Sequence, residues 1–346
     1  IYITEAVKLR ALALYSVITT VASIFCLGAA MLIYLRTGDA GFLYNDSLSD
    51  AIGKQSVYFA LMINIAIFSY GYLLVKQYLS RTASRMAVAA ICFLVIIHFM
   101  LASRMEIIFL YSTAILYTMY HFFIKKKNRK TGFIMIGAMV ACALVFMLLF
   151  PKTINRFNEL GYPQYNMHSD AAESHYNMKL TAEQWNGFNI RLAIWNCAWP
   201  LIESQPLMGT GLGDKDKDLQ NQFVANDFKF GIRTNKNMHS TYLDVMSSMG
   251  IIGLLIFLAG FVLLPMRQSV QAKDLIGILI LVDLSLSFLT ETYPDRSMGN
   301  VLLGFFVAFI CCYKGQSNRA RKDTGQTARP GSAKILYRPV ATTSNR

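Results

Sequence analysis

His239 is the residue best suited to acid–base chemistry, because it stands where a long polar segment meets an apolar run that continues to Leu264. Much of a histidine population is neutral near pH 7, so its imidazole could take a proton from a hydroxyl group. At such a junction the ring can face both water and a lipid-lined groove. The alternative is a histidine at the start of a helix whose ring bonds the backbone, and spacing alone leaves both interpretations open.

Arginines near the apolar runs could bind an anionic group. Arg104 lies between two such runs, where an arginine near membrane depth costs about 2.5–3.5 kcal/mol, so we expect it to have a partner or ligand. Snorkelling to lipid headgroups is the alternative. Arg191 is followed at four-residue steps by Trp195 and Trp199, which predicts a helix with these side chains along one stripe. We expect Pro200 to end this helix, and its tryptophans to anchor at a membrane interface or stack on sugar rings.

Two glycine-rich stretches lie on either side of His239. The stretch 206–213, PLMGTGLG, predicts a tight turn and is weak evidence for a nucleotide site, and the run 214–218, DKDKD, is typical of a solvated surface. After His239, Gly250, Gly253 and Gly260 fall at three- and seven-residue spacings. We expect these three glycines to share one helical face that lets another helix approach closely.

Two acidic residues lie inside apolar runs. Asp283 is in the middle of one and is either a packing residue or part of a proton relay. Asp244 is five residues after His239, about 140° around a helix, so we do not expect it to orient the imidazole. We expect it instead to bond the serines on its own face, which are Ser240, Ser247 and Ser248.

The composition indicates a membrane protein. Hydrophobic residues make up 54% of the 346 residues, charged residues only 15%, and the mean hydropathy is +0.39, which argues against a soluble enzyme. We predict an all-α fold, a polytopic transmembrane helix bundle of about eight spans. The expected spans lie near residues 11–35, 56–75, 86–102, 105–124, 131–150, 241–264, 275–290 and 298–313.

Basic residues predict the orientation of these spans, because cytoplasmic connections are enriched in lysine and arginine. The basic connections alternate consistently onto one side, so we expect both ends of the chain in the cytoplasm. Residues 1–150 would form the N-terminal transmembrane helices and 241–313 the C-terminal ones. Residues 151–240, with nine basic and nine acidic residues, would fold as one large periplasmic loop domain. The basic tail 314–346 is expected to be disordered and to rest on anionic membrane lipids rather than on nucleic acid.

The cysteines give no disulfide framework, since five of the six lie inside apolar runs, and no group of residues has metal-ligand spacing. No charged leader with a cleavage site precedes the first run, so we expect no signal peptide.

Three features in order resemble a known family: Arg191 followed by Trp195, the turn 206–213, and His239-Ser240 followed after nine residues by Gly250-x-x-Gly253. Together they resemble the outer loop and following span of the O-antigen ligase and O-antigen (Wzy-type) polymerase family of bacterial inner-membrane glycan transferases. The resemblance covers roughly residues 190–260 in detail, with weaker support from Ser103-Arg104.

The resemblance implies transfer of a glycan from undecaprenyl diphosphate to an acceptor hydroxyl at the periplasmic face of the inner membrane, without metal, ATP or cofactor. It implies that His239 and Arg191 are catalytic, with His239 as general base and Arg191 on the diphosphate. Further candidates for binding the diphosphate are Arg104, Arg233 and Arg296, because a guanidinium donates two parallel hydrogen bonds and stays charged. Trp195 and Trp199 are candidates for the sugar or the membrane interface.

The acceptor decides between the activities that remain open. It is lipid A-core for a ligase, a second lipid-linked repeat of a growing polysaccharide for a polymerase, or a protein hydroxyl for an oligosaccharyltransferase. After Gly253 the chain lacks the Thr-x-Gly of some ligases. Outside this class, a transporter or flippase would also be polytopic and basic but would not need a folded outer domain, and an assembly protein would tolerate substitution of Arg191 or His239.

Overall fold

The computed structural model describes residues 2–174, 181 and 183–313, and its regular structure is helical. Within these residues there is no β-strand, only two isolated bridges. The predicted all-α fold and polytopic bundle are therefore confirmed. Six helical segments are long and apolar enough to cross a membrane: α1 (Glu5–Thr37), α3 (Ser56–Val75), α4 (Arg81–Leu101), α5 (Arg104–Met119) extended to Lys125, α6 (Arg129–Leu149), and α11 (Thr241–Phe257) extended through α12 (Leu264–Gln271).

The last two predicted spans are helices, but shorter ones. They are α13 (Leu275–Ser287) and α14 (Ser297–Cys312), of 13 and 16 residues. At about 1.5 Å per residue, 13 helical residues cover roughly 20 Å of a hydrocarbon core that is about 30 Å thick. Length and composition thus support six spans, and a count of eight stays a prediction.

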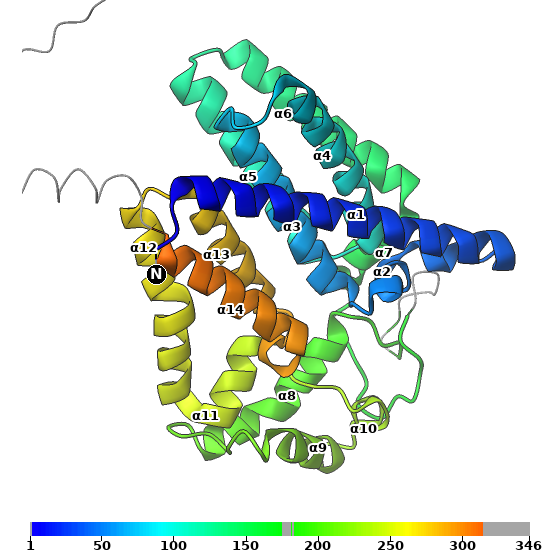
Figure 1. The fold of residues 1–346 in the computed structure, drawn as a ribbon. Helices are drawn as coiled ribbons and strands as arrows, with labels where there is room; N and C mark the ends of the chain where they lie inside the picture. The colour runs from blue at the N-terminus through cyan, green and yellow to red at the C-terminus, as the bar shows by residue number, and fades with distance from the viewer. Residues whose placement is uncertain (1, 175–180, 182, 314–346) are drawn as a thin grey trace, which may run out of the picture.

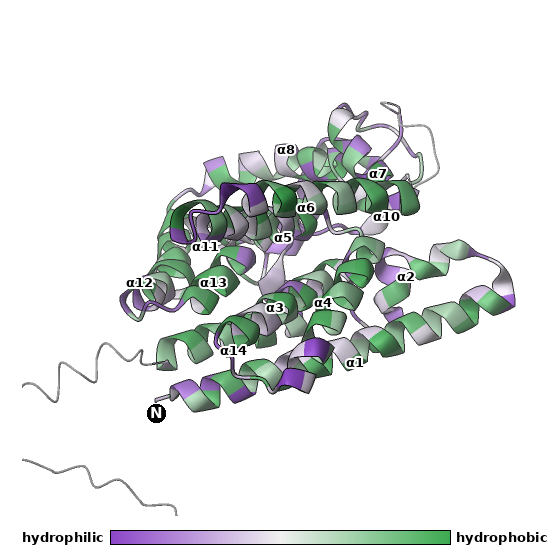
Figure 2. Ribbon diagram, turned by 90° about the horizontal axis from the view of Figure 1, so that it is seen from above, coloured by the Kyte–Doolittle hydropathy of each residue, from purple (hydrophilic) through white to green (hydrophobic). Residues whose placement is uncertain are grey.

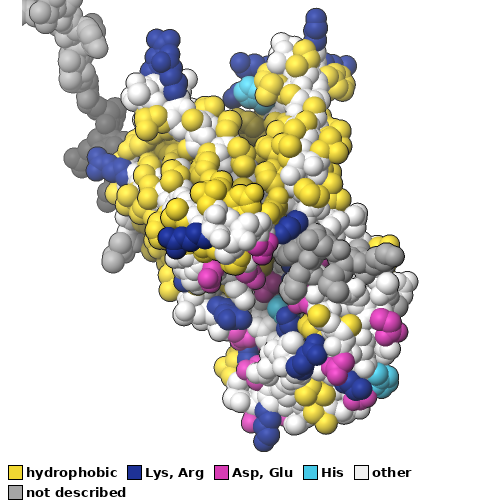
Figure 3. Space-filling view, turned by 90° about the vertical axis from the view of Figure 1, so that its right-hand side faces the viewer, with side chains coloured by type: hydrophobic (Ala, Val, Ile, Leu, Met, Phe, Trp, Pro, Cys, Tyr) yellow, Lys and Arg dark blue, Asp and Glu magenta, His cyan; other side chains and the backbone are white. Residues whose placement is uncertain are grey.

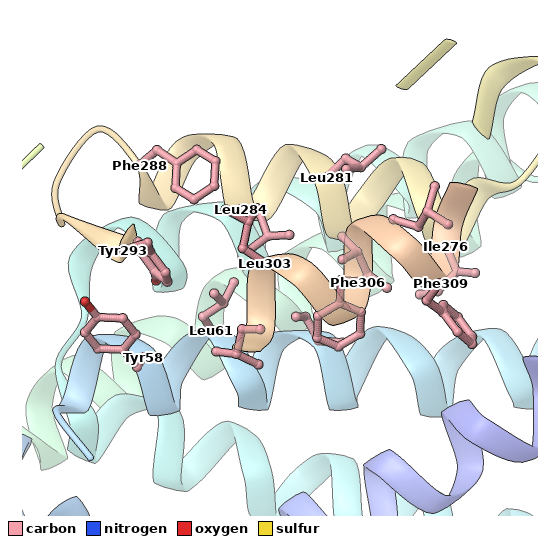
Figure 4. Close-up of a cluster of buried hydrophobic side chains, with 14 of the residues drawn as sticks. Tyr58, Leu61, Ile276, Leu281, Leu284, Phe288, Tyr293, Leu303, Phe306 and Phe309 are labelled. Carbon is pink, nitrogen blue, oxygen red and sulfur yellow. The ribbon is translucent and has the colours of Figure 1, made fainter. Parts of the chain in front are cut away.

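α13 and α14 nevertheless lie inside the bundle. Figure 4 shows their side chains facing those of α3, with Leu61 opposite Leu303 and the rings of Tyr58 and Tyr293 side by side. The ring centroids of Tyr58 and Tyr293 are 4.6 Å apart, and Phe288 contacts Tyr293 from α13. Aromatic pairs of this kind add about 0.5–1.5 kcal/mol beyond the area that they bury. The packed helices therefore form the wall behind the loop that joins α13 to α14.

The two ends of the described chain lie beside each other (Figure 1). Ile3 bridges to Tyr313, and the hydroxyl of Tyr313 donates to the carboxylate of Glu5. Nearby, the buried ammonium of Lys8 donates to Asp274 Oδ1 at 2.5 Å and lies 3.9 Å from the ring centroid of Tyr313. Both ends of the described chain thus lie on one side of the bundle, where an even number of spans would place them. The tail 314–346 lies outside the described residues.

The segment between α6 and α11 forms a hydrophobic cluster of its own around the buried Trp185. Its helices are α7 (Pro151–Asn158), α8 (Asn189–Ser204), α9 (Lys215–Ala225) and α10 (Lys229–Thr234). The expectation that Pro200 ends α8 is wrong, because Pro200 lies inside the helix. A proline in a helix costs about 3 kcal/mol, and the burial of Leu201 and Ile202 just beyond it offsets that cost.

The surface divides in the same way as the chain. Figure 2 shows the long helices coloured hydrophobic along most of their length, with hydrophilic residues at their ends and connections. In Figure 3, hydrophobic side chains form a broad band across the upper part of the face, with lysine and arginine at its upper edge, whereas aspartate and glutamate appear below the band together with further lysine and arginine. Three short helices on the connection from α1 to α3 lie near this boundary: η1 (Ala40–Leu43), α2 (Asn45–Ser49) and η2 (Asp50–Ile52).

Candidate active site

Arg191, Glu291 and His239 form one charged group where α8, the start of α11 and the α13–α14 connection meet. Glu291 Oε1 accepts a hydrogen bond from Arg191 Nη2 at 2.8 Å, and Glu291 Oε2 lies 3.4 Å from His239 Nδ1. Arg191 also donates through Nε and Nη2 to the carbonyl oxygen of Thr290, at 3.1 Å in both cases. One buried carboxylate therefore joins the two residues that the motif singled out.

Glu291 is 6% exposed and lies outside the candidate spans. Burial alone would raise its pKa, but the contacts with His239 and Arg191 outweigh burial and lower the pKa of Glu291 to about 2. The carboxylate is therefore charged at neutral pH. A carboxylate beside Nδ1 favours the imidazole tautomer that carries its proton there, which leaves Nε2 as the basic nitrogen.

The backbone at the start of α11 fixes His239 against the loop that carries Glu291. His239 has a φ of 46°, an uncommon conformation for a residue other than glycine, and its N–H donates to Asn237 Oδ1 at 3.2 Å. Two residues on, the buried Thr241 donates through Oγ1 to the carbonyl oxygen of Glu291 at 2.7 Å and accepts from the N–H of Tyr293 at 3.0 Å. The imidazole and the carboxylate thus belong to one rigid joint.

Two further arginines, Arg104 and Arg156, lie beside Arg191 around Gly187. Arg104 donates through Nη1 to the carbonyl oxygen of Arg156 at 2.7 Å, and Glu159 Oε2 lies 3.3 Å from Arg104 Nη1 and 3.2 Å from Arg156 Nη1. A Cβ atom at Gly187 would come within 2.8 Å of Arg156 Nη1 and 3.5 Å of Arg104 and Arg191 nitrogens. A side chain at position 187 would therefore push the Arg156 guanidinium aside, and glycine leaves room for it beside Arg104 and Arg191.

A cavity of about 620 Å³ opens beside this group. Its lining includes Arg156, Arg191 and His239 and reaches the α1–α3 connection at Tyr44 and Ser47. Other basic residues of the lining are Lys152, whose ammonium lies 4.9 Å from the ring centroid of Tyr44, and Lys236, which is 3.5 Å from Glu173. Its charged lining is mixed, with Lys152, Arg156, Arg191 and Lys236 on the basic side and Asp39, Asp46, Glu173 and Glu291 on the acidic side.

A second cavity, of about 460 Å³, shares Gln55, Lys236 and His239 with the first. Arg296 and Asp295 line it, together with amide side chains such as Asn237. His239 consequently borders both cavities, which is the position that a group acting between two substrates requires.

The structure does not bring every predicted residue to this place. Arg233 is half exposed on the far side of the loop, where Nη1 donates to the carbonyl oxygen of Asp170 at 3.1 Å, and it lines neither cavity. Trp199 is 52% exposed and donates to Glu203 on its own helix. Trp195 is partly buried, and its Nε1 donates to the carbonyl oxygen of Met238 at 3.1 Å. It therefore supports the residue before His239 from α8.

The run 214–218 is not only a solvated surface. Lys215 is 11% exposed and donates to Asp244 Oδ2 at 2.7 Å and also to the carboxylate of Asp295. Burial lowers the pKa of Lys215, but the two carboxylates outweigh it, and the pKa is raised. Asp244 bonds two of the predicted serines, but through its backbone: the hydroxyls of Ser247 and Ser248 donate to its carbonyl oxygen, and its carboxylate pairs with Lys215.

The glycine-rich turn and the glycines of α11 form one backbone joint. Gly250 has φ 64° and ψ −169°, so it breaks α11, and the prediction that it shares a continuous helical face with Gly253 and Gly260 is wrong. The turn docks at this break: Thr210 N–H donates to the carbonyl oxygen of Ser247 at 2.9 Å. A Cβ atom on Gly250 would lie 2.2 Å from the backbone of Leu207. The two glycine motifs are thus complementary halves of one contact.

Asp283 lies in a buried polar cluster inside the bundle. The carboxyl groups of Asp283 and Glu106 share one amide: Asn64 Nδ2 donates to Glu106 Oε2 at 2.8 Å and to Asp283 Oδ1 at 3.4 Å. Ser287 donates to Glu106 Oε1 at 2.5 Å. The hydrophobic pattern gave Asp283 no visible partner, and the structure supplies one from α5, two residues after Arg104.

Sequence reasoning missed Glu291, Arg156 and Lys215. Glu291 stands in a short connection of ordinary polar composition, and Arg156 follows a predicted span in the same way as many basic residues that face lipid headgroups. The one signal for Lys215 was its place between the glycine-rich turn and the acidic run.

Comparison with known proteins identifies one family. A family model described as O-antigen ligase matches residues 78–258, which is more than half of the chain and includes Arg104, Arg191 and His239. Glu291 lies beyond the matched range. A search of curated proteins gave no match.

Proposed function

The chain belongs to the O-antigen ligase family, and from this premise we propose that it transfers a glycan from undecaprenyl diphosphate to an acceptor hydroxyl at the periplasmic face of a bacterial inner membrane. The observation that carries the proposal is the arrangement of Arg191, Glu291 and His239 at the edge of a cavity that two lysines and a second arginine also line. Two helices that can cross a membrane begin beside it, α5 at Arg104 and α11 at Thr241, as a lipid-linked donor requires.

The cations suit the donor. A lipid diphosphate leaves readily once its negative charge is balanced, and guanidinium groups bind phosphate oxygens through two parallel hydrogen bonds. Arg104, Arg156 and Arg191 converge around Gly187, and Lys152 and Lys236 line the same cavity. We assign the diphosphate to this cavity and place the membrane-spanning helices behind it on the side of the lipid chain.

The imidazole suits the acceptor. As the acceptor oxygen attacks the anomeric carbon, the bond from that carbon to the diphosphate breaks, and His239 takes the hydroxyl proton at Nε2. Glu291 stabilises the imidazolium that forms, because its carboxylate lies 3.4 Å from Nδ1. The products are the glycosylated acceptor and undecaprenyl diphosphate. The reaction as proposed requires neither a metal nor a nucleotide.

Substitution of the base tests the assignment directly. His239→Ala should lower the transfer rate by about 10²–10⁴-fold in purified protein, because no base then takes the proton from the acceptor hydroxyl. Arg191→Ala should also abolish transfer, and Arg191→Lys should not restore it fully, since an ammonium does not donate in the same fork. The matched control is His168→Ala, because His168 is an exposed histidine paired with Asp227 on the surface of the loop. Parental rates in purified His239→Ala protein would refute the general-base role.

The acceptor is the finer part of the proposal. We favour lipid A-core, and therefore a ligase, over a second lipid-linked repeat, because the spacing from His239 to Gly253 is the most specific part of the resemblance. Loss of a ligase leaves long chains on the lipid carrier and none on lipid A-core. Loss of a polymerase leaves lipid A-core capped by at most one repeat. Gel analysis of surface glycan from a deletion strain separates the two outcomes.

The proposed orientation has a test of its own. In a variant without native cysteines, a cysteine at Asp216 should react with an impermeant thiol reagent in intact cells, and a cysteine at Lys126 should not. Both positions are exposed, so accessibility to solvent does not distinguish them. Labelling at 126 alone would place the candidate site on the cytoplasmic side.

A further inference from the structure

Three large apolar side chains are exposed on the turn that docks against the break in α11. Leu207, Met208 and Leu212 are 62%, 71% and 64% exposed, and we call them the turn surface. Exposed leucines scattered singly need no explanation, but three within six residues form a patch. The residues that follow it, 214–222, are polar or charged apart from the buried Leu219, so the patch ends there.

The turn that carries the turn surface is held firmly in place, so looseness of the turn does not explain the exposure. Hydrogen bonds hold the turn to both sides of the break in α11: Gly211 N–H donates to the carbonyl oxygen of Ser248 at 2.9 Å, and Ile251 N–H donates to that of Pro206 at 2.8 Å. Gly209 and Gly250 bring the two backbones together where no side chain would fit. The exposed side chains are therefore presented in a fixed direction.

The turn surface adjoins residues of a candidate membrane span. Beyond Gly250 the segment Thr241–Gln271 continues with Ile252, Leu255 and Ile256, which are 45%, 58% and 66% exposed. Apolar side chains exposed on a membrane-spanning helix face lipid. Since Ile252 N–H bonds to the carbonyl oxygen of Leu207, the turn surface begins where this lipid-facing surface ends.

We propose that the turn surface inserts into the lipid at the membrane interface and anchors the far end of α8 there. α8 has 16 residues, about 24 Å of helix, with Arg191 in its first turn and the glycine-rich turn directly after its last. The Arg191 end is fixed to the bundle through Glu291 and the carbonyl of Thr290. The exposed Trp199, nearer the turn, is the residue type that favours the interface. Two anchors then set the depth of Arg191 relative to the bilayer.

Spin labels measure this contact in the full-length protein. In a variant without native cysteines, reconstituted into vesicles of phosphatidylethanolamine and phosphatidylglycerol, a nitroxide is attached at Met208→Cys or Leu212→Cys. The matched control is Val224→Cys on α9, which is equally exposed at 65% but belongs to a mostly polar helix. Collision rates with oxygen, which partitions into lipid, and with a water-soluble nickel chelate are compared at each position.

We expect positions 208 and 212 to collide more with oxygen than with the chelate, and position 224 to do the reverse. Chelate accessibility at 208 and 212 equal to that at 224 would overturn the anchor, and so would lipid accessibility at all three positions, because the contact would then not be specific to the turn surface. The measurement does not depend on glycan transfer, so its outcome is separate from that of the proposed function.

Discussion

Two buried carboxyl groups, that of Asp283 inside α13 and that of Glu291 in the loop that follows α13, have opposite surroundings. Glu291 faces an arginine and a histidine and is held as a carboxylate. Asp283, eight residues earlier in the bundle, lies near a second carboxyl group, that of Glu106, and accepts its hydrogen bond from the neutral amide of Asn64, which Glu106 also binds. Within the described residues Asp283 Oδ2 has no hydrogen-bond partner.

The difference shows what each group contributes. A buried carboxylate beside a guanidinium keeps its charge and can orient an imidazole, whereas two carboxyl groups close together cannot both stay charged without strong repulsion. We therefore expect the Glu106–Asp283 pair to hold a proton and to act in packing, by joining the start of α5, which carries Arg104, to the end of α13, which leads to Glu291. Glu291 would then serve the proposed chemistry, and the Glu106–Asp283 pair would hold the helices that carry it.

The same substitution at the two glutamates should have opposite outcomes. Glu291→Gln removes the negative charge between Arg191 and His239, and we expect a loss of transfer on the order of 10²–10⁴-fold, since the imidazolium loses its counter-charge. Glu106→Gln keeps the shape and a hydrogen-bonding head beside Asp283, so transfer should fall by less than about 10-fold. Initial rates of the two purified variants in lipid nanodiscs provide the comparison. Equal losses would show that charge is not what separates the two regions.

Removal of Lys215 should give Asp244 a surrounding like that of Asp283. Asp244 is 5% exposed and paired with Lys215, so Lys215→Ala leaves a buried carboxylate without its cation. Breaking a buried pair in this way costs roughly 3–5 kcal/mol. Thermal unfolding in detergent should show a large fall in Tm for Lys215→Ala and almost none for Lys217→Ala, its exposed neighbour on α9. A fall of the same size at both positions would argue against the buried bridge.

The stability that Glu291 contributes should depend on pH in the acid range. Its pKa is lowered from 4.5 to about 2 in the folded protein, so the folded state binds fewer protons than the unfolded state between these values. The stabilisation is fully present above about pH 5 and is lost as pH falls toward 2, a change of about 3 kcal/mol. The difference in stability between the parent protein and Glu291→Gln should therefore shrink over this range and stay constant from pH 6 to 8. A constant difference down to pH 2 would contradict the lowered pKa.

Sequence reasoning predicted the parts of this molecule that depend on local composition. Six runs of apolar residues became six helices of spanning length, because burial of the backbone in lipid requires a helix wherever such a run occurs. Arg191 and His239 were found through motif order, Arg104 was found through the cost of an arginine near membrane depth, and Arg191 lies close to both of the others. The predictions failed where a distant partner determines the position of a residue. Lys215 was assigned to the solvent although two carboxylates bind it. Gly250 was assigned to a helical face although it breaks the helix where the turn docks.

The missed residues share a physical reason. Glu291 lies 100 positions from Arg191, and Glu159 lies 55 from Arg104, so their pairing is a result of the fold and leaves no pattern in either segment. The separate periplasmic domain at 151–240 and the disordered tail stay predictions, the first because a hydrophobic cluster around Trp185 does not by itself define a domain.

The smallest effect is expected at Arg233, where the sequence predicts a diphosphate ligand and the structure places an exposed pair. Arg233 and Asp170 have side chains 50% and 69% exposed, and a surface pair of this kind contributes about 0–1 kcal/mol. Since Arg233 lines neither cavity, Arg233→Ala should leave both Tm and the transfer rate close to those of the parent protein, whereas Arg191→Ala in the same assay should abolish transfer. Loss of transfer in Arg233→Ala, with an unchanged Tm, would mean that the loop moves on binding the donor and brings this arginine to the diphosphate. Exposure of an ion pair would then predict its small effect on Tm but not its effect on the transfer rate.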